Sequence, residues 1–320
     1  MTRIRSKLLS AFSLAASLAY STNVMAADCT PSKWGAEDEI GSANLITAER
    51  VIAASKLVKQ GKAHPLGIVI DPKMPAYPPR SMHLEVVQPG QQHGKSLEGA
   101  VAWPMIYNDD MAQLWFGIGP QLDGLGHMGE AGYFYNCNHT DDISDFSGLK
   151  KLGIHTVPPL VGRGVLIDMA KHFGVTSLEK GQGFSSQDIK AAADKQGVRI
   201  QEGDVVLFHT GWTDAKMNAE PDLWVSGEPG LTNEAGAFLA SLNVMAVGSD
   251  TWGLGAVPPI PGDKFGYDHI SLMKENGIFV LETMNTGGLA KEGVKEFLFV
   301  LGQPRVKGAV QMLVNPIALY

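Results

Sequence analysis

Short apolar runs that alternate with helical patterns constrain the fold of this chain more than any other feature. The runs are rich in Val, Ile and Leu, and their near-continuous apolar character is typical of strands buried on both faces of a sheet. The alternation of such strands with helices indicates the α/β class. The predicted strands are Leu66–Asp71, Gly164–Met169, Asp204–Thr210, Val244–Asp250 and Ile278–Thr283.

The segments between these runs have the end signals of helices. Hydroxyl and amide side chains stand where N-caps are expected, and glycines stand at two of the predicted C-terminal ends. Residues 296–319 indicate two further strands and a turn, which close the sheet or cover its edge. The predicted helices run from Thr47 to Gly61, from Ser185 or Ser186 to Gly197, and from Thr232 or Asn233 to Asn243.

The first 26 residues have the features of a secretory signal peptide. Three basic residues precede an apolar run over about residues 8–20, and Val-Met-Ala at 24–26 suits a signal peptidase. The run is shorter than the roughly 20 residues that span a bilayer, which disfavours a membrane anchor. We expect cleavage after Ala26 and a mature domain, residues 27–320, that is periplasmic or secreted and does not contact the membrane.

The mature chain is acidic. Cleavage would remove three of the 26 Lys and Arg residues and none of the 33 Asp and Glu residues, so the formal net charge would fall from −7 to −10. A chain of this charge without basic runs disfavours nucleic acid as a partner. Its length suits one large domain, and the expected partner is a small-molecule substrate.

Two cysteines, Cys29 and Cys137, are relevant because disulfides persist in the compartment expected for this chain. They form either a bridge or two unpaired thiols. The sequence leaves both alternatives open, since a bridge requires Cα atoms within about 6 Å of each other.

A glycine-rich segment, residues 117–136, contains Asp123 and His127 four positions apart. Its glycines disfavour a long helix, each by up to about 1 kcal/mol relative to Ala, and they let the backbone approach a ligand closely. On spacing alone an ordinary surface loop is the favoured interpretation, and a metal and proton-transfer site is the alternative.

A second candidate pair is His269 and Glu282. A helix from His269 to Gly277 followed by a strand back to Glu282 would bring the two side chains together, given the rise per residue of each element. An imidazole and a carboxylate that meet would suit a divalent cation. The alternatives are a helix-start role for His269 after Asp268 and an ion pair of Glu282 with Lys or Arg.

Familiar catalytic signatures are absent from the sequence, including G-x-S-x-G, H-E-x-x-H, the phosphate loop and C-x-x-C. Asp250 remains a candidate because it ends a predicted strand, where α/β proteins build ligand sites. His209 is more typical of a core histidine than of a ligand, and His139 of a solvated turn.

Several of these segments resemble the cyclase family, metal-dependent hydrolases that include bacterial kynurenine formamidase and isatin hydrolase. The resemblance extends from about Asn108 to the C-terminus and rests on QLDGLGHMG, GVLIDM, GDVVLFHTGW and GSDTW, together with His269 and Glu282. It implies a single mixed-sheet α/β domain of the swivelling β/β/α-like type, and it implies a homo-oligomer.

The resemblance also implies roles for residues. The family pattern His-x-x-x-His-x-Asp-x-x-x-His places a metal ligand at Asp123 and the catalytic acid/base at His127. The later metal ligands of the family fall on His269 and Glu282.

Gly117 and Gln121 stand where the family pattern has its first two histidines. The carbonyl oxygen of Gln121 is a weak, neutral ligand. We therefore expect either a metal-free pocket or a single Mn²⁺ or Zn²⁺ ion held by Asp123, His269 and Glu282, with Gln121 as a further ligand.

The implied activity is a hydrolase acting on carbon–nitrogen bonds other than peptide bonds, with a small amide, lactam or related carbonyl compound as substrate. Two alternatives remain open: a metal-free lyase or dehydratase that uses His127 and Asp123, and a non-catalytic periplasmic small-molecule-binding protein. The expected substrate-binding residues are Asp250 and three tryptophans, Trp103, Trp212 and Trp252. The tryptophan rings would suit a planar substrate.

Overall fold

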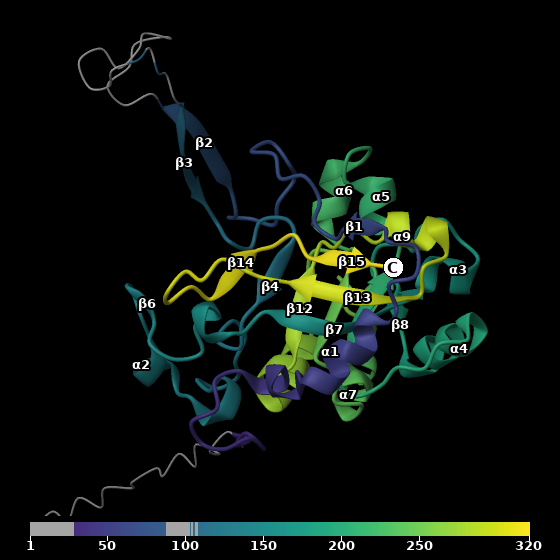
Figure 1. Ribbon diagram of the computed structural model, residues 1–320, viewed down its shortest axis with the longest axis horizontal. Coiled ribbons are helices and arrows are strands. Elements are labelled where there is room, and N and C mark those ends of the chain that lie inside the picture. The colour runs from purple at the N-terminus through teal and green to yellow at the C-terminus, as the bar shows by residue number, and fades with distance from the viewer. Residues whose placement is uncertain (1–28, 88–102, 104, 106–107) are drawn as a thin grey trace, which may run out of the picture.

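The computed structural model describes residues 29–87, 103, 105 and 108–320 (Figure 1). Within them a mixed α/β domain is built on a nine-stranded sheet with the order β1-β15-β13-β7-β9-β11-β12-β4-β14. The strands of this sheet are β1 (Ala63–Pro65), β4 (Gln121–Asp123), β7 (Leu160–Asp168), β9 (Val205–His209), β11 (Ala246–Ser249), β12 (Phe279–Glu282), β13 (Glu296–Leu301), β14 (Gln311–Leu313) and β15 (Ile317–Leu319).

The centre of this sheet is parallel. β7 pairs with β9, β9 with β11, and β11 with β12, all in the parallel sense. The side chains of β9, β11 and β12 are buried along their whole length, as the near-continuous apolar runs predicted. Four of the five predicted strands are therefore confirmed, with ends that differ by a few residues.

The prediction of a strand at Leu66–Asp71 is wrong. The strand in this region is β1, which ends at Pro65 and pairs antiparallel with β15. Beyond it the backbone of Gly67 donates to the side chain of Asn315 and not to a neighbouring strand. Leu66 is buried in the core but Val69 is 88% exposed, so the apolar side chains of this segment are not buried together as in a central strand.

The sheet curls so that its two ends approach each other. β14 forms one end of the strand order and β15 lies second from the other end, yet residues 314–316 alone connect them. Such a connection spans at most about 14 Å, which forces the curl. The two strands predicted over residues 296–319 are three in the structure, and β14 adds to the edge of β4.

The three predicted helices are confirmed as α1, α4 and α7. Thr47, Ser185 and Thr232 each accept a hydrogen bond at the N-terminal end, and Gly197 ends α4 in the left-handed conformation. α1 ends at Ser55, before the predicted Gly61. The helices are α1 (Ala48–Ser55), α2 (Thr140–Ile143), α3 (Met169–Phe173), α4 (Ser186–Gln196), α5 (Trp212–Lys216), α6 (Pro221–Ser226), α7 (Asn233–Ser241), α8 (Tyr267–His269) and α9 (Gly287–Glu292), with 3-10 turns η1 (Gly41–Leu45), η2 (Tyr135–Cys137) and η3 (Ile154–Thr156) and a π-helical turn η4 (Ile270–Lys274).

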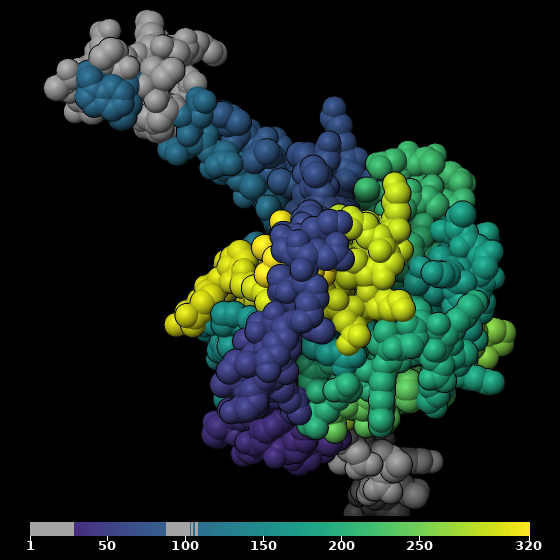
Figure 2. Space-filling model, turned by 45° about the vertical axis from the view of Figure 1, so that its right-hand side comes forward, coloured from purple at the N-terminus to yellow at the C-terminus, as the bar shows by residue number. Residues whose placement is uncertain are grey.

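A two-stranded arm projects from the rounded body of the molecule (Figures 1 and 2). It consists of β2 (Met82–Val87) and β3 (Asp109–Leu114), which pair antiparallel. Two further pairs are short: β5 (Ser144–Asp145) with β6 (Gly148–Leu149), and β8 (Gly183–Phe184) with β10 (Gly230–Leu231).

Cys29 and Cys137 form a disulfide, with Cα atoms 5.1 Å apart. The bridged alternative is thus the one that the structure supports, and it ties the N-terminal segment to the chain after the glycine-rich loop. Across the described residues, no helix combines the length and apolar character needed to span a membrane. The predicted signal peptide lies outside the described residues.

Candidate active site

Three buried side chains from separate elements converge at one point. Asp123 ends β4, Glu282 ends β12 and His269 ends α8. His269 Nε2 lies 3.1 Å from Glu282 Oε1 and 3.7 Å from Asp123 Oδ2. The exposed fractions are 0% for Asp123, 4% for Glu282 and 5% for His269. The predicted meeting of His269 with Glu282 is confirmed, and Asp123 joins them.

The antiparallel pairing of β4 with β12 explains why the carboxylates meet. In its register Glu282 lies opposite Gln121 and Val280 opposite Asp123. Residues 121 and 123 share one face of the strand, because side chains alternate along it. Gln121, Asp123 and Glu282 are therefore neighbours on the same side of the sheet.

A tight reversal of the chain brings His269 to this point. The predicted helix from His269 to Gly277 is confirmed: helical backbone runs without a break through α8, the π-helical turn η4 and residues 275–276, and Gly277 ends it in the left-handed conformation, φ 64°. The chain then runs back as β12 to Glu282. Thr283 follows at φ 55°, a conformation that a β-branched residue rarely adopts. Its N–H donates to Thr251 O, which fixes the backbone beside Glu282.

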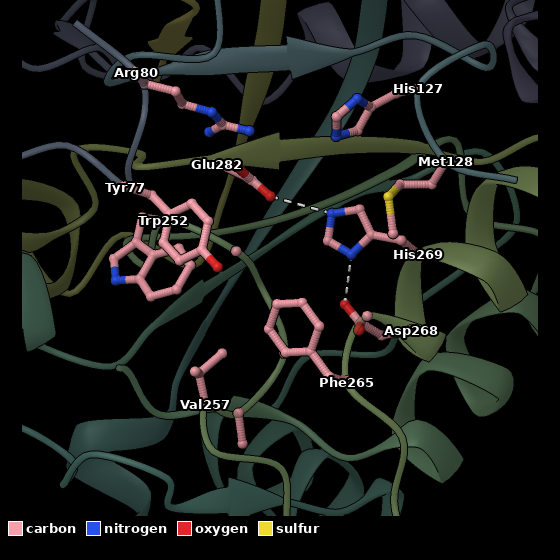
Figure 3. A pocket seen from close by; sticks show the side chains of 14 residues that line it. Tyr77, Arg80, His127, Met128, Trp252, Val257, Phe265, Asp268, His269 and Glu282 are labelled. Atoms are coloured by element: carbon pink, nitrogen blue, oxygen red, sulfur yellow. Dashed lines mark hydrogen bonds and ion pairs between the residues drawn. The ribbon is translucent and has the colours of Figure 1, made fainter. Parts of the chain in front are cut away.

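Asp268 orients the imidazole of His269. Its Oδ2 lies 2.9 Å from His269 Nδ1, so that Nε2 faces Glu282 (Figure 3). A carboxylate behind a histidine in this way fixes the ring and its tautomer, as in many metal sites. The signal for Asp268 in the sequence is its position directly before the candidate ligand His269.

Two oxygen atoms of the cluster are buried without hydrogen-bond partners, Asp123 Oδ2 and Gln121 Oε1. The remaining polar atoms are occupied: Gln121 Nε2 donates to Glu282, and Gln311 Nε2 donates to Asp123 Oδ1 at 2.6 Å. Unpartnered buried oxygens are uncommon in native proteins. Of the two, Asp123 Oδ2 lies 3.7 Å from His269 Nε2.

This donor set fits a divalent cation. One ligand atom from each of Asp123, His269 and Glu282 lies within 4.8 Å of the others. Imidazole nitrogen and carboxylate oxygen are ligands for both zinc and manganese. The orphaned Asp123 Oδ2 would gain a partner in such a complex. Gln121 presents its amide nitrogen to the carboxylates, so ligation through its carbonyl oxygen would require a rotation of the amide.

The pKa shifts of the clustered side chains also favour a bound cation. Burial raises the pKa of Glu282 to about 7, and the charge of Asp123 adds to this. Burial also acts to raise the pKa of Asp123, but His127, His269 and Gln311 outweigh it and lower that pKa. Burial lowers the pKa of His269, but the neighbouring carboxylates, Asp268 first, raise it well above its ordinary value. Positive charge is thus favoured among these carboxylates.

His127 stands at the wall of the adjacent cavity and not within the cluster of ligands. It lies in the turn after β4, where its N–H donates to Gly124 O. Its ring centroid is 6.4 Å from that of His269. Burial lowers the pKa of His127, with His269 and Arg80 acting in the same direction and Asp123 opposing. A neutral imidazole of this kind can accept a proton at neutral pH.

The cavity beside the cluster has a volume of about 220 Å³ and mostly apolar walls (Figure 3). Tyr77 stacks on Trp252 with ring centroids 4.9 Å apart. An apolar cavity with a few convergent polar groups is typical of a small-molecule site. Its wall includes Tyr77, Met128, Trp252, Val257 and Phe265, and its polar side chains are Arg80, His127, Asp268, His269 and Glu282.

The predicted tryptophan wall is partly corrected. Trp252 lines the cavity, but Trp212 is fully buried and packs behind it with Trp224. Trp103 is 63% exposed and belongs to the stretch between β2 and β3, so it does not line this cavity. The apolar character of a tryptophan does not indicate whether it lines the cavity, packs in the core or lies exposed.

Asp250 does not line the cavity either. It is buried, and its carboxylate accepts hydrogen bonds from Thr210 N, Thr210 Oγ1 and Gly211 N. This side chain therefore holds the turn after β9 in place. His209 is a satisfied core histidine, as expected, with its Nδ1 2.9 Å from Thr286 Oγ1. His139 caps the start of α2.

Sequence reasoning missed Arg80, Tyr77 and Phe265. They come from two irregular segments outside the predicted elements, and nothing in their local pattern indicates a site. Gln311 was missed because the strand that carries it, β14, was not separated from its neighbours. Its pairing with β4 places it opposite Asp123.

The sequence over residues 64–256 matches a family model described as "Putative cyclase". The chain belongs to this cyclase family. The match includes Asp123 and His127 and ends before His269 and Glu282. It confirms the resemblance drawn from the motifs. No curated protein matches the sequence.

Solved structures agree with the family. This cyclase-family chain is similar to a crystal structure described as a novel cyclase, with 27% identity, a TM-score of 0.81 and coverage of 90% of this chain and 98% of the other. An isatin hydrolase bound to the product analogue thioisatinate has 18% identity, a TM-score of 0.61 and coverage of 86% and 99%. A protein from Bacillus stearothermophilus described as a predicted metal-dependent hydrolase has 17% identity, a TM-score of 0.51 and coverage of 80% and 97%.

Proposed function

We propose that this cyclase-family protein is a metal-dependent hydrolase that cleaves a small amide, lactam or related carbonyl compound. The observation that carries the proposal is the buried cluster of Asp123, His269 and Glu282, with an unpartnered Asp123 Oδ2, at the wall of an apolar cavity. Structures of similar fold include isatin hydrolases and a protein described as a metal-dependent hydrolase, which supports the same reaction class.

Asp123, His269 and Glu282 would hold one Mn²⁺ or Zn²⁺ ion, with Gln121 as a further ligand. A bound divalent ion polarises a carbonyl group and lowers the pKa of water toward neutrality. Asp268 keeps His269 Nε2 turned toward the carboxylates, and Gln311 occupies Asp123 Oδ1 so that Oδ2 faces the cluster.

His127 would act as the general base and acid. Its lowered pKa keeps the imidazole neutral near pH 7, so that it can take a proton from an attacking water molecule. The same proton would then pass from the imidazole to the leaving nitrogen or oxygen. Met128, Phe265 and the stacked pair Tyr77–Trp252 would hold a planar substrate and exclude water from the reacting carbonyl.

Hydrolysis of N-formyl aromatic amines and of cyclic amides tests this function. The protein should hydrolyse a member of this panel after purification, lose activity with a chelator, and regain it with Mn²⁺ or Zn²⁺. Turnover that resists the chelator but needs His127 and Asp123 would favour the metal-free lyase or dehydratase. A ligand retained through purification without any turnover would favour a binding protein.

Export of the protein is a second proposal, with cleavage after Ala26. The disulfide between Cys29 and Cys137 supports it, because such bonds persist in the periplasm and outside the cell. Intact-mass analysis of the protein from the periplasmic or secreted fraction should give a chain that begins at Ala27. A cytosolic chain that begins at Met1 would contradict export.

Homo-oligomer formation is also proposed. Apolar side chains on the projecting arm are solvent-exposed within one chain, among them Leu84, Val86 and Met111 at 44%, 68% and 56%. Light scattering during size-exclusion chromatography should give a multiple of the monomer mass, and a monomer at micromolar concentration would contradict the proposal.

A further inference from the structure

The cavity holds a guanidinium group that forms no ion pair with a carboxylate of the described residues. Arg80 points into it beside Glu282 and toward His127 (Figure 3). Its Nη1 donates to Gly117 O at 2.6 Å. Within the part of the chain that the structure describes, Arg80 forms no ion pair and no second hydrogen bond. The donors on Nε and Nη2 are thus available to a ligand.

The absence of a side chain at Gly117 makes room for this group. A Cβ atom at position 117 would lie 2.8 Å from Arg80 Cζ and 3.0 Å from Gln311 Oε1. Real side chains do not approach so closely, so any larger residue would displace the guanidinium. The position of the Arg80 guanidinium at this edge of the cavity therefore depends on a glycine at position 117.

The backbone also fixes where Arg80 lies. Its N–H donates to Tyr77 O in a turn that contains Pro78 and Pro79. Tyr77 in turn stacks on Trp252 at the cavity wall. A planar ligand against these rings would present one edge to Arg80 and its neighbouring atoms to His127 and the metal-binding cluster.

The guanidinium of Arg80 is partly buried beside Glu282, and its Nε and Nη2 donors are left for a ligand in the cavity. Its planar fork matches a carboxylate better than it matches a single neutral oxygen. We propose that Arg80 binds a carboxylate of the substrate, and that the substrate is a planar amide or lactam with a carboxylate near the carbonyl that is cleaved. This inference rests on the proposed hydrolase function for the reaction, but the anion site can be tested without turnover.

Benzoate and benzamide are suitable probes, because they share shape and differ in charge. Calorimetric titrations should show that benzoate binds the wild-type protein more tightly than benzamide does. Arg80→Gln should weaken benzoate binding about tenfold or more, as expected for loss of hydrogen bonds to a charged group, and should leave benzamide binding unchanged. Arg80→Lys should recover part of the benzoate affinity, and Arg305→Gln, an exposed site, should have no effect.

Gly117→Ala tests the same site without removal of the charge. The added Cβ meets the far end of a flexible side chain, so the fold should persist while the guanidinium moves. Benzoate binding should weaken with a thermal unfolding midpoint close to that of the wild-type protein. Each titration is made with metal-free protein and again after addition of Mn²⁺ or Zn²⁺.

Several results would overturn the inference. Wild-type protein that binds benzoate no better than benzamide is one, and Arg80→Gln that binds benzoate like the wild type is another. Benzoate binding that needs the metal and ignores Arg80 would place the carboxylate on the ion. If Arg80-dependent benzoate binding persists in metal-free protein while no amide is hydrolysed, the anion site stands and the hydrolase proposal fails.

Discussion

His127 is the residue whose substitution most directly separates catalysis from metal binding. Its side chain lies at the cavity wall, outside the cluster of Asp123, His269 and Glu282. His127→Ala should lower kcat by about 10²- to 10⁴-fold, the usual contribution of general acid–base catalysis, and should leave the metal content unchanged. Steady-state kinetics and elemental analysis of the same preparation measure both.

His83→Ala is the matched control, since His83 lies exposed on the arm. It should retain wild-type kcat and metal content. A His127→Ala protein that keeps the wild-type rate would contradict the acid/base assignment, and one that loses its metal would place His127 among the ligands.

The site residues divide into those that local sequence could reveal and those that need the tertiary fold. His269 and Glu282 could be brought together from helix and strand geometry, and Asp123 through the family pattern. Arg80 could not, because its role depends on the space left by Gly117, 37 positions away. A local sequence pattern does not show which distant residue leaves space for a side chain.

The contact between β7 and the residue before β9 should make the stability of the fold depend on pH. Asp204, just before β9, accepts hydrogen bonds from Gln201 N and from Arg163 Nη1 on β7. Burial raises the pKa of Asp204 to about 6, although Arg163 and the Gln201 N–H oppose this. The folded state thus holds this proton more tightly than the unfolded chain does.

The sign follows from this difference in pKa. The favourable contribution is present below the unfolded pKa, near 3.9, and is lost as the pH rises through about 6. Relative to Asp204→Asn, the free energy of unfolding of the wild-type protein should fall by about 2 kcal/mol between pH 4 and pH 7. Urea denaturation of both proteins across this range measures the difference, and parallel curves would contradict it.

The elements predicted well are long, apolar or capped, such as β7 and α4. β4 and β14 were not predicted, because each has three residues, with polar residues at both ends of β4 and at the first position of β14. Their strand conformation comes from pairing with β12 and with each other. The segment Leu66–Asp71 shows the opposite error, since its apolar residues do not enter a ladder. Short strands depend on neighbours that the local sequence does not identify.

At the scale of the whole molecule, the disulfide should stabilise the fold. Cys29 and Cys137 are 108 positions apart, so the bond closes a long loop of the unfolded chain. Loss of a native disulfide typically lowers the free energy of unfolding by about 2–5 kcal/mol. The double variant Cys29→Ser, Cys137→Ser should therefore unfold at lower urea concentration.

Addition of a reductant supplies the control for this comparison. It should shift the wild-type unfolding curve toward that of the double variant and leave the variant unaffected. Identical curves for the oxidised wild type and the variant would contradict a stabilising role for the bond.

The curl of the sheet connects the fold with the proposed function. It brings β14 against β4, so that Gln311 reaches Asp123 while β12 and α8 supply Glu282 and His269. The central claim is that these carboxylates and this imidazole bind a catalytic divalent ion. The most direct test is a crystal structure of the protein refilled with Mn²⁺ or Zn²⁺, with anomalous scattering measured at the absorption edge of the metal. We expect one peak bonded to Asp123, His269 and Glu282 in the wild-type protein and none in Asp123→Asn. A wild-type crystal without a peak at these residues would show that they bind no metal.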